Sequence, residues 1–186
     1  MKSKLFVVAG PSGVGKGTII KELIKENDNL KYSVSSTTRL PRKGEINGVN
    51  YDFLTQDEFK KAIEKGDFLE WAVYNENYYG TKKTVVDNAL KNSKSIILEI
   101  EIQGAIQIME KCPDAVFIFI LPPSYEELEK RLRGRNTEDE QTILNRLKIT
   151  QKELEVGEKF RYKVVNDNIE NAVAQVKSII DKECEC

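Results

Sequence analysis

The strongest structural signal in the sequence is the glycine-rich stretch 10–18, which reads GPSGVGKGT. It follows the apolar segment 5–9 and precedes segment 19–24, which has helical spacing, so a strand, a loop and a helix are expected in that order. Glycines let successive backbone N–H groups point at one anion, and the start of a helix adds partial positive charge. Lys16 supplies a mobile cation for the β- and γ-phosphates of a nucleotide. We interpret the stretch as a phosphate-binding P-loop.

One position departs from the usual pattern of such a loop. Gly17 stands where the motif has Ser or Thr, and a hydroxyl follows one place later at Thr18. Direct ligation of Mg²⁺ by a hydroxyl at position 17 is therefore not expected. The residues predicted to bind the phosphates of a nucleoside triphosphate through this loop are Gly13, Val14, Gly15, Lys16, Gly17 and Thr18.

The hydrophobic pattern beyond the loop predicts an α/β fold. Strand patterns at 32–35, 95–101, 116–121 and 162–165 are separated by helix patterns or by longer insertions, which is typical of a parallel sheet. With the P-loop, this predicts a P-loop NTPase fold whose central parallel sheet is flanked by helices. Segment 35–92 lacks the alternation and indicates a small inserted subdomain.

Charge and composition exclude several classes of function. The chain has 29 basic and 30 acidic side chains and a net charge of -1, so no chain-wide attraction to nucleic acid or to anionic membranes is expected. No apolar run approaches the ~20 residues of a membrane span. The three cysteines give no disulfide framework, and we expect a cytoplasmic protein. Because the chain has no histidine, catalysis must use carboxylates, lysine, arginine and backbone dipoles.

Arginines form two groups apart from the P-loop. Arg39 and Arg42 lie in a turn-rich polar segment, and a second group follows the strand pattern at 116–121. Planar guanidinium groups suit phosphoryl oxygens, and phosphoryl transfer is catalysed mainly by positioning and charge neutralisation. Single arginines in such segments are also compatible with plain solvation. The second group consists of Arg131, Arg133, Arg135 and Arg146.

Three carboxylates suggest further chemistry. Glu99 and Glu101 are two apart on an expected strand, so they share one face and can meet a metal, its waters or a substrate donor. A paired-carboxylate hydrolase is a rival interpretation, but it leaves the P-loop unexplained. Glu70 alone is compatible with a surface position. Beside a base it would select guanine, because one carboxylate can accept from the adjacent N1–H and N2–H groups.

The chain resembles the guanylate kinase family along nearly its whole length. The P-loop is shared, and the segment SVSSTTRLPR at 33–42 is especially specific. Further matching stretches are Gly44-Glu45, Tyr51, 68–72, 77–81, 98–104, 122–124, 131–135 and 165–167. The resemblance implies the reaction ATP + GMP ⇌ ADP + GDP with Mg²⁺ in purine nucleotide metabolism. It also implies a core over 1–34, 93–134 and 157–186, a GMP-binding subdomain over 35–92 and a lid over 135–156.

The resemblance further implies the roles of individual residues. Lys16, Arg39, Arg135 and Arg146 would be catalytic, the last two from the lid, with Arg131 close by on the ATP side and Asn166 where the family meets adenine. The family often has Asp where this chain has Glu101. Mg²⁺ is expected to be held by phosphates and waters, with Thr18, Glu99 and Glu101 in its outer shell. The residues implied to bind GMP are Ser35, Arg39, Arg42, Tyr51, Glu70, Tyr79, Thr81 and Glu101.

Two alternatives stay open at this point. One is a kinase of another mononucleotide such as AMP, against which Glu70 argues. The other is a non-catalytic module that binds phosphopeptides, against which the intact P-loop with Lys16 argues. The sequence also leaves open whether dGMP is accepted and whether the chain is a monomer or a weak homodimer.

Overall fold

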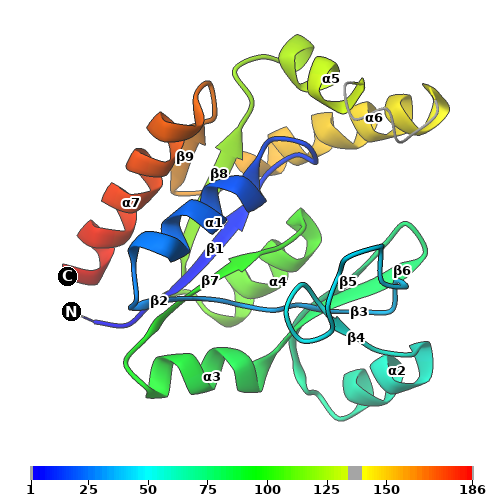
Figure 1. Cartoon of the computed structure of the whole chain (residues 1–186), viewed down its shortest axis with the longest axis vertical. Helices are drawn as coiled ribbons and strands as arrows, with labels where there is room; N and C mark the ends of the chain where they lie inside the picture. The colour runs from blue at the N-terminus through cyan, green and yellow to red at the C-terminus, as the bar shows by residue number, and fades with distance from the viewer. Residues whose placement is uncertain (1, 134–139, 186) are drawn as a thin grey trace.

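The computed structural model describes residues 2–133 and 140–185 and contains two β-sheets with helices around them (Figure 1). The strands are β1 (Leu5–Ala9), β2 (Leu30–Tyr32), β3 (Ser36–Thr37), β4 (Asp52–Phe53), β5 (Phe68–Tyr74), β6 (Asn77–Lys82), β7 (Ser95–Glu99), β8 (Val116–Leu121) and β9 (Tyr162–Val165). The helices are α1 (Lys16–Glu26), α2 (Gln56–Glu64), α3 (Lys83–Lys91), α4 (Ile102–Lys111), α5 (Tyr125–Arg133), α6 (Glu140–Gly157) and α7 (Ile169–Glu185).

The central sheet has five parallel strands in the order β2-β7-β1-β8-β9. In the register of its middle strands, Val7 lies between Leu98 and Phe117. The carboxyl ends of all five strands therefore lie at one edge, where the P-loop follows β1. This arrangement confirms the predicted fold class, and it places any ligand of the loop at that edge.

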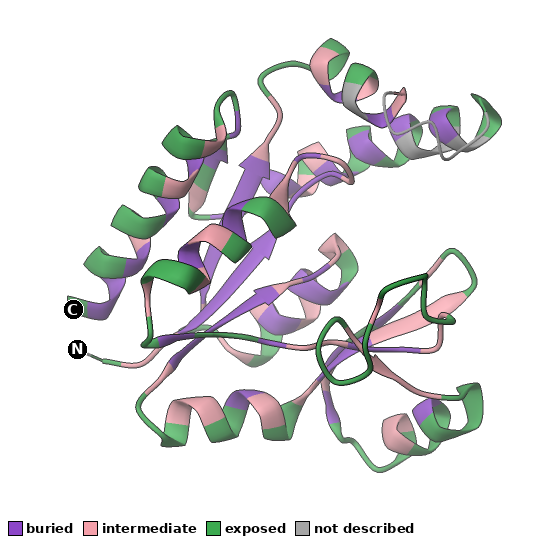
Figure 2. Cartoon of the chain, in the orientation of Figure 1, coloured by how far each residue is buried: buried purple, intermediate pink, exposed green. Residues whose placement is uncertain are grey.

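Two hydrophobic layers cover the central sheet, whose three middle strands β7, β1 and β8 are largely buried (Figure 2). One layer joins Phe6, Val8 and Ile118 to apolar side chains of α1, α5, α6 and α7. The other joins Val7, Leu98 and Phe119 to side chains of α3, α4 and the end of α6. Alternate residues of β1 serve opposite layers, so burial on both faces explains the unbroken apolar runs of the central strands.

A second, four-stranded sheet has the order β4-β3-β6-β5, and its strands come from segment 36–82. Helix α2 packs beside it, with the Phe59 ring 4.3 Å from the Phe68 ring between centroids. Thr55 and Glu58 form a capping box at the start of α2. This sheet lies within the segment expected to be an insertion, and it faces the P-loop edge of the central sheet (Figure 1).

Two of the predicted strands have different bounds in the structure. β2 ends at Tyr32, three residues before the predicted end, because the chain then leaves the sheet for β3. Only the Ser33 N–H still bonds to the central sheet, at the Ile97 oxygen over 3.0 Å. β7 ends at Glu99, and Glu101 is already the N-cap of α4. The expectation that Glu99 and Glu101 share a strand face is therefore wrong.

The two ends of the described chain lie side by side (Figure 1). The Lys2 N–H donates to the Cys184 oxygen over 3.0 Å. Among the described residues, no helix combines the length and the apolar character needed to cross a membrane. The cytoplasmic location stays a prediction.

Candidate active site

A cavity of about 520 Å³ lies between the P-loop and the four-stranded sheet. Residues from both sheets line it, so the structure brings together groups that are far apart in the sequence. The predicted site residues among them are Gly13, Gly15, Lys16, Gly17, Thr18, Ser35, Arg39, Arg42, Tyr51, Glu70, Tyr79, Glu99 and Glu101.

The P-loop is fixed from behind by two predicted ATP-binding residues. Val14 is fully buried in the core, and the Asn166 amide donates to the Val14 oxygen over 2.7 Å. Gly15 has a left-handed backbone with φ of 99°, and a Cβ there would lie 2.5 Å from the Asn166 amide nitrogen. The loop can therefore approach Asn166 only with glycine at this position. The structure places Asn166 behind the loop, and its contact with adenine stays a prediction.

Lys16 is the first residue of α1 and lies against the loop. Its ammonium donates to the Gly10 oxygen over 2.6 Å and to the Pro11 oxygen over 3.2 Å. The first N–H groups of a helix have no partner within the helix, so the start of α1 offers donors to the cavity. A lysine charge and these dipoles together suit a polyphosphate.

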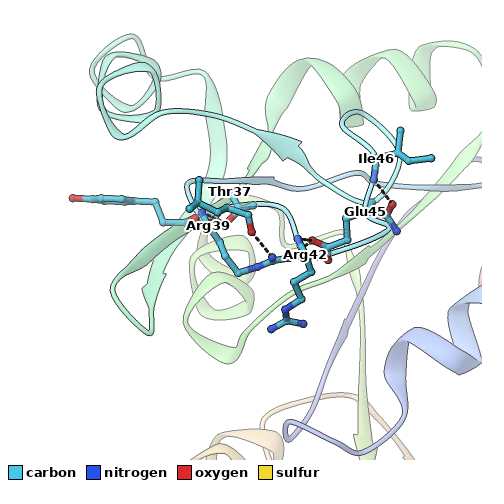
Figure 3. Close-up of polar contacts among 8 residues, drawn as sticks. Thr37, Arg39, Arg42, Glu45 and Ile46 are labelled. Atoms are coloured by element: carbon cyan, nitrogen blue, oxygen red, sulfur yellow. Dashed lines mark hydrogen bonds and ion pairs between the residues drawn. The ribbon is translucent and has the colours of Figure 1, made fainter. Parts of the chain in front are cut away.

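Arg39 is held in a fixed position on the opposite side of the cavity (Figure 3). Its guanidinium donates to both oxygens of Glu45, over 2.8 and 3.0 Å, and to the Leu40 oxygen over 2.6 Å. The Glu45 carboxylate also accepts from the Arg42 N–H over 2.7 Å. These two hydrogen bonds lower the pKa of Glu45, and the one from Arg39 has the larger effect. Figure 3 shows the Arg42 guanidinium pointing away from this pair, which leaves its donors available.

Two tyrosines stand beside this arginine. The Arg39 guanidinium lies 5.3 Å from the centroid of the Tyr51 ring, and the Tyr51 and Tyr79 rings meet edge to face at 6.0 Å. Burial has the largest effect on the pKa of Tyr51 and raises it, and the electrostatic effects of Tyr79 and Glu99 raise it further. The Tyr51 phenol thus remains a hydrogen-bond donor at neutral pH, and the two hydroxyl groups suit a phosphate oxygen.

Glu70 is a buried carboxylate at the edge of the cavity and is only 3% exposed. Its Oε1 accepts from the Thr81 hydroxyl over 2.7 Å. Burial raises the pKa of Glu70, against the opposing effect of the Thr81 hydrogen bonds. Thr81, predicted to bind GMP, is itself fully buried and does not line the cavity. The structure thus shows Thr81 as the partner of Glu70.

The carboxylate of Glu99 occupies the space beside Gly17. A Cβ at position 17 would lie 3.3 Å from the Glu99 Oε2, so a carboxylate lies beside the position where the P-loop pattern has a hydroxyl side chain. Burial raises the pKa of Glu99, and the Lys16 charge lowers it. Oxygen donors of Glu99, Glu101 and Thr18 suit the waters of a hard cation such as Mg²⁺. Within the described ranges, no three acidic or cysteine side chains gather as a closed metal site requires.

Among the other residues that line this cavity, three charged or aromatic ones received no role from sequence reasoning. Glu45, Tyr32 and Tyr74 line it as well. Glu45 follows Arg39 by six residues in a turn-rich segment, and that opposite charge was the available signal. Tyr32 and Tyr74 gave no signal, because their patterns are those of strand residues.

The side chains of three predicted arginines are not placed by the structure. Arg135 lies outside the described residues, and Arg131 and Arg146 belong to α5 and α6 with side chains outside the described part. Their roles stay predictions.

Comparisons with known proteins agree with this geometry. The family model described as guanylate kinase matches residues 2–183. The chain belongs to the guanylate kinase family. A guanylate kinase from Clostridioides difficile (strain 630) is 48% identical over 182 residues, which are 98% of this chain and 89% of the relative. One from Clostridium perfringens (strain SM101 / Type A) is 51% identical over 176 residues, covering 95% and 82% of the two chains.

A solved structure also matches. The guanylate kinase from Anaplasma phagocytophilum superposes with a TM-score of 0.80 at 32% identity and covers 98% of this chain and 86% of its own. Membership of the guanylate kinase family confirms the resemblance, the P-loop NTPase fold and the prediction of an enzyme. It supports ATP-dependent phosphorylation of GMP to GDP as the reaction.

Proposed function

We propose that the cavity between the two sheets holds GMP opposite ATP, so that one phosphoryl group passes directly between them. The observation that carries this proposal is that Glu70 and the Arg39–Arg42 pair face the P-loop across one cavity of about 520 Å³. A buried carboxylate and two guanidinium groups match the two ends of a guanine nucleotide, the base and the phosphate.

The base end is recognised by Glu70, with Ser35 and Glu101 as further polar groups around guanine and Thr81 behind the carboxylate. Thr81 already occupies one lone pair of Glu70 over 2.7 Å, which holds the carboxylate in place. The remaining lone pairs accept the N1–H and N2–H groups of guanine together. Adenine offers no such pair of donors, and leaving a buried carboxylate unpaired is costly. This geometry favours GMP over AMP.

The phosphate end is bound by Arg39, Arg42, Tyr51 and Tyr79. Arg39 is pre-oriented by Glu45, so little side-chain entropy is lost when it binds. Arg42 is exposed and has its donors available. Their charges neutralise the acceptor phosphate, which would otherwise repel the phosphates of ATP.

The donor side is formed by Gly13, Val14, Gly15, Lys16, Gly17 and Thr18. Backbone N–H groups of the loop hold the ATP phosphates, and Lys16 exchanges its two loop carbonyls for phosphate oxygens. An ionised oxygen of GMP attacks the γ-phosphorus in line, the bond to the ADP oxygen breaks, and no general base is required. Arg135 and Arg146 add positive charge from the lid, Arg131 adds it from the neighbouring end of the core, and Asn166 lies on the adenine side.

Mg²⁺ suits this arrangement as the partner of ATP, where it neutralises phosphate charge. The waters of the ion would be held by Thr18, Glu99 and Glu101. These residues supply oxygen donors beside the loop, and Glu99 fills the space left by Gly17. Direct coordination stays with phosphates and waters.

We also propose how the parts of the chain move. The core comprises 1–34, 93–134 and 157–186, the GMP-binding subdomain 35–92 and the lid 135–156. Closure of the subdomain and the lid over the core would exclude water and so prevent ATP hydrolysis.

The variant Glu70→Gln tests the guanine-binding part of this proposal. The glutamine amide has only one acceptor atom, and its NH₂ group would face a donor of the base, so it cannot accept N1–H and N2–H side by side as a carboxylate does. The kcat/KM for GMP should therefore fall about ten- to a hundredfold, through KM. The KM for ATP should not change. Because burial opposes ionisation of Glu70, the neutral variant should fold. Glu64→Gln on the exposed side of α2 is the matched control. A Glu70→Gln protein with the kcat/KM of the wild type for GMP would contradict the proposal.

A further inference from the structure

Helix α4 holds the main chain of β5 on both sides of Glu70. The Lys111 ammonium donates to the oxygen of Leu69, the residue before Glu70, over 2.7 Å. The Gln107 amide binds Trp71, the residue after it, by donating to its oxygen over 2.6 Å and accepting from its N–H over 3.3 Å. One helix thus fixes both neighbours of the guanine-reading carboxylate.

Strand β5 needs this support because of where it lies. It is an edge strand of the four-stranded sheet, and its pairing with β6 shifts register between Phe68 and Glu70. Edge strands leave main-chain groups unpaired, and a register shift loosens the ladder locally. The Gln107 amide takes the place of the missing neighbouring strand at Trp71, because it supplies both a donor and an acceptor.

The Glu70 carboxylate itself lies against α4 at Gly104, where the helix has no side chain. A Cβ at Gly104 would stand 2.2 Å from the Glu70 Oε2 and 2.9 Å from its Cδ. Glycine is therefore required for the carboxylate to take this position. Gly104 is the third residue of α4, where the helix end carries partial positive charge that suits a carboxylate. Gly104, Gln107 and Lys111 are three and four residues apart and share one face of the helix.

We infer that α4 sets the selectivity for guanine, with Gly104 and Gln107 as positioning residues that hold the Glu70 carboxylate against the base. The inference rests on the proposed function. Gly104 leaves the space that the carboxylate occupies, and Gln107 holds the strand that carries Glu70. Two hydrogen bonds from adjacent donors of one base require both oxygens in one orientation, so a displaced carboxylate can no longer accept from both donors together. It then loses the advantage that the 2-amino group gives guanine over a base with N1–H alone.

The test compares GMP with inosine monophosphate, which differs only by lacking the 2-amino group. In Gly104→Ala the new methyl group displaces the flexible end of Glu70, and alanine favours the helix, so this variant should fold. Gln107→Leu removes both hydrogen bonds to Trp71 at similar size. In both variants the ratio of kcat/KM for GMP to that for inosine monophosphate should fall about tenfold, with the KM for ATP unchanged.

Gln175→Leu on the exposed side of α7 is the matched control and should keep the ratio of the wild type. Loss of stability alone would lower both kcat/KM values together and leave their ratio unchanged.

Trp71 is the only tryptophan of the chain and gives a second measurement. A fluorescence titration with GMP should show a Kd about tenfold higher in both variants, independently of turnover. If Gln107→Leu does not fold, Gly104→Ala carries the test by itself.

The outcomes separate this inference from the proposed function. If the wild type does not prefer GMP to inosine monophosphate, or if Glu70→Gln leaves that preference intact, the proposed function fails. If Glu70→Gln abolishes the preference but folded Gly104→Ala and Gln107→Leu proteins keep it, only the role of α4 is overturned.

Discussion

Arg39 shows how single residues prepare this site. Its guanidinium is tied to Glu45 and the Leu40 oxygen and stacked 5.3 Å from the Tyr51 ring before any phosphate contacts it. Glu45 raises the pKa of Arg39 further, so its charge is permanent. The same partners restrict its rotamers, so the guanidinium does not have to be ordered when GMP binds.

Replacing Arg39 should therefore impair the acceptor side selectively. In Arg39→Ala we expect kcat/KM for GMP to fall about a hundredfold or more, corresponding to about 3 kcal/mol of lost transition-state stabilisation. The KM for ATP should change little. Steady-state kinetics with each substrate varied in turn provides the measurement. Arg161→Ala is the matched control, since Arg161 pairs with Glu183 outside the cavity. Equal losses for both variants would argue against a phosphate contact by Arg39.

Among the elements, α6 carries a buried carboxyl group that interacts electrostatically with Lys16. Glu153 on this helix is 6% exposed. Burial, with a smaller effect of the Glu101 charge, raises the pKa of Glu153 to about 7, while the Lys16 charge acts to lower it. Between pH 4.5 and about 7, Glu153 therefore keeps its proton in the folded state and has lost it in the unfolded state. This group adds full stability below its unfolded pKa of 4.5, and that stability is lost as pH rises through about 7.

Glu153→Gln should remove this pH dependence. At pH ~8 the variant should have a free energy of unfolding up to about 3 kcal/mol higher than the wild type, and at pH ~5 the difference should be below about 1 kcal/mol. Urea unfolding at the two pH values measures both differences. Glu155→Gln, an exposed neighbour on the same helix, should show no such change. A difference between Glu153→Gln and wild type that does not vary with pH would contradict the assignment.

Elements also show what the sequence can predict. β8 and β9 have the predicted bounds. β8 lies inside a sheet covered on both faces, and β9 ends at clear turn signals. β2 was shifted, because the end of an edge strand depends on the path of the chain to the other sheet. The P-loop was readable because its chemistry is local. The contact of Gln107 with Trp71 was not, because it joins residues 36 positions apart through tertiary packing.

At the scale of the whole molecule, two sheets with different tasks face one cavity. The parallel sheet presents the P-loop at its carboxyl edge, and the four-stranded sheet presents Glu70 and the arginine pair. Neither sheet alone offers partners for both nucleotides. Under the proposed function, this division explains why the activity should depend on the acceptor, since the proposed closure of the lid and the subdomain would exclude water only with both substrates bound.

The most direct measurement of this account is the release of ADP from ATP with Mg²⁺ in the presence of different acceptors. With GMP, ADP should form rapidly and in equal amount to GDP. With AMP, CMP, UMP or no acceptor, ADP release should stay near background, because none of these presents the adjacent N1–H and N2–H donors to Glu70. ADP release with AMP as fast as with GMP, or equally fast without any acceptor, would contradict the account.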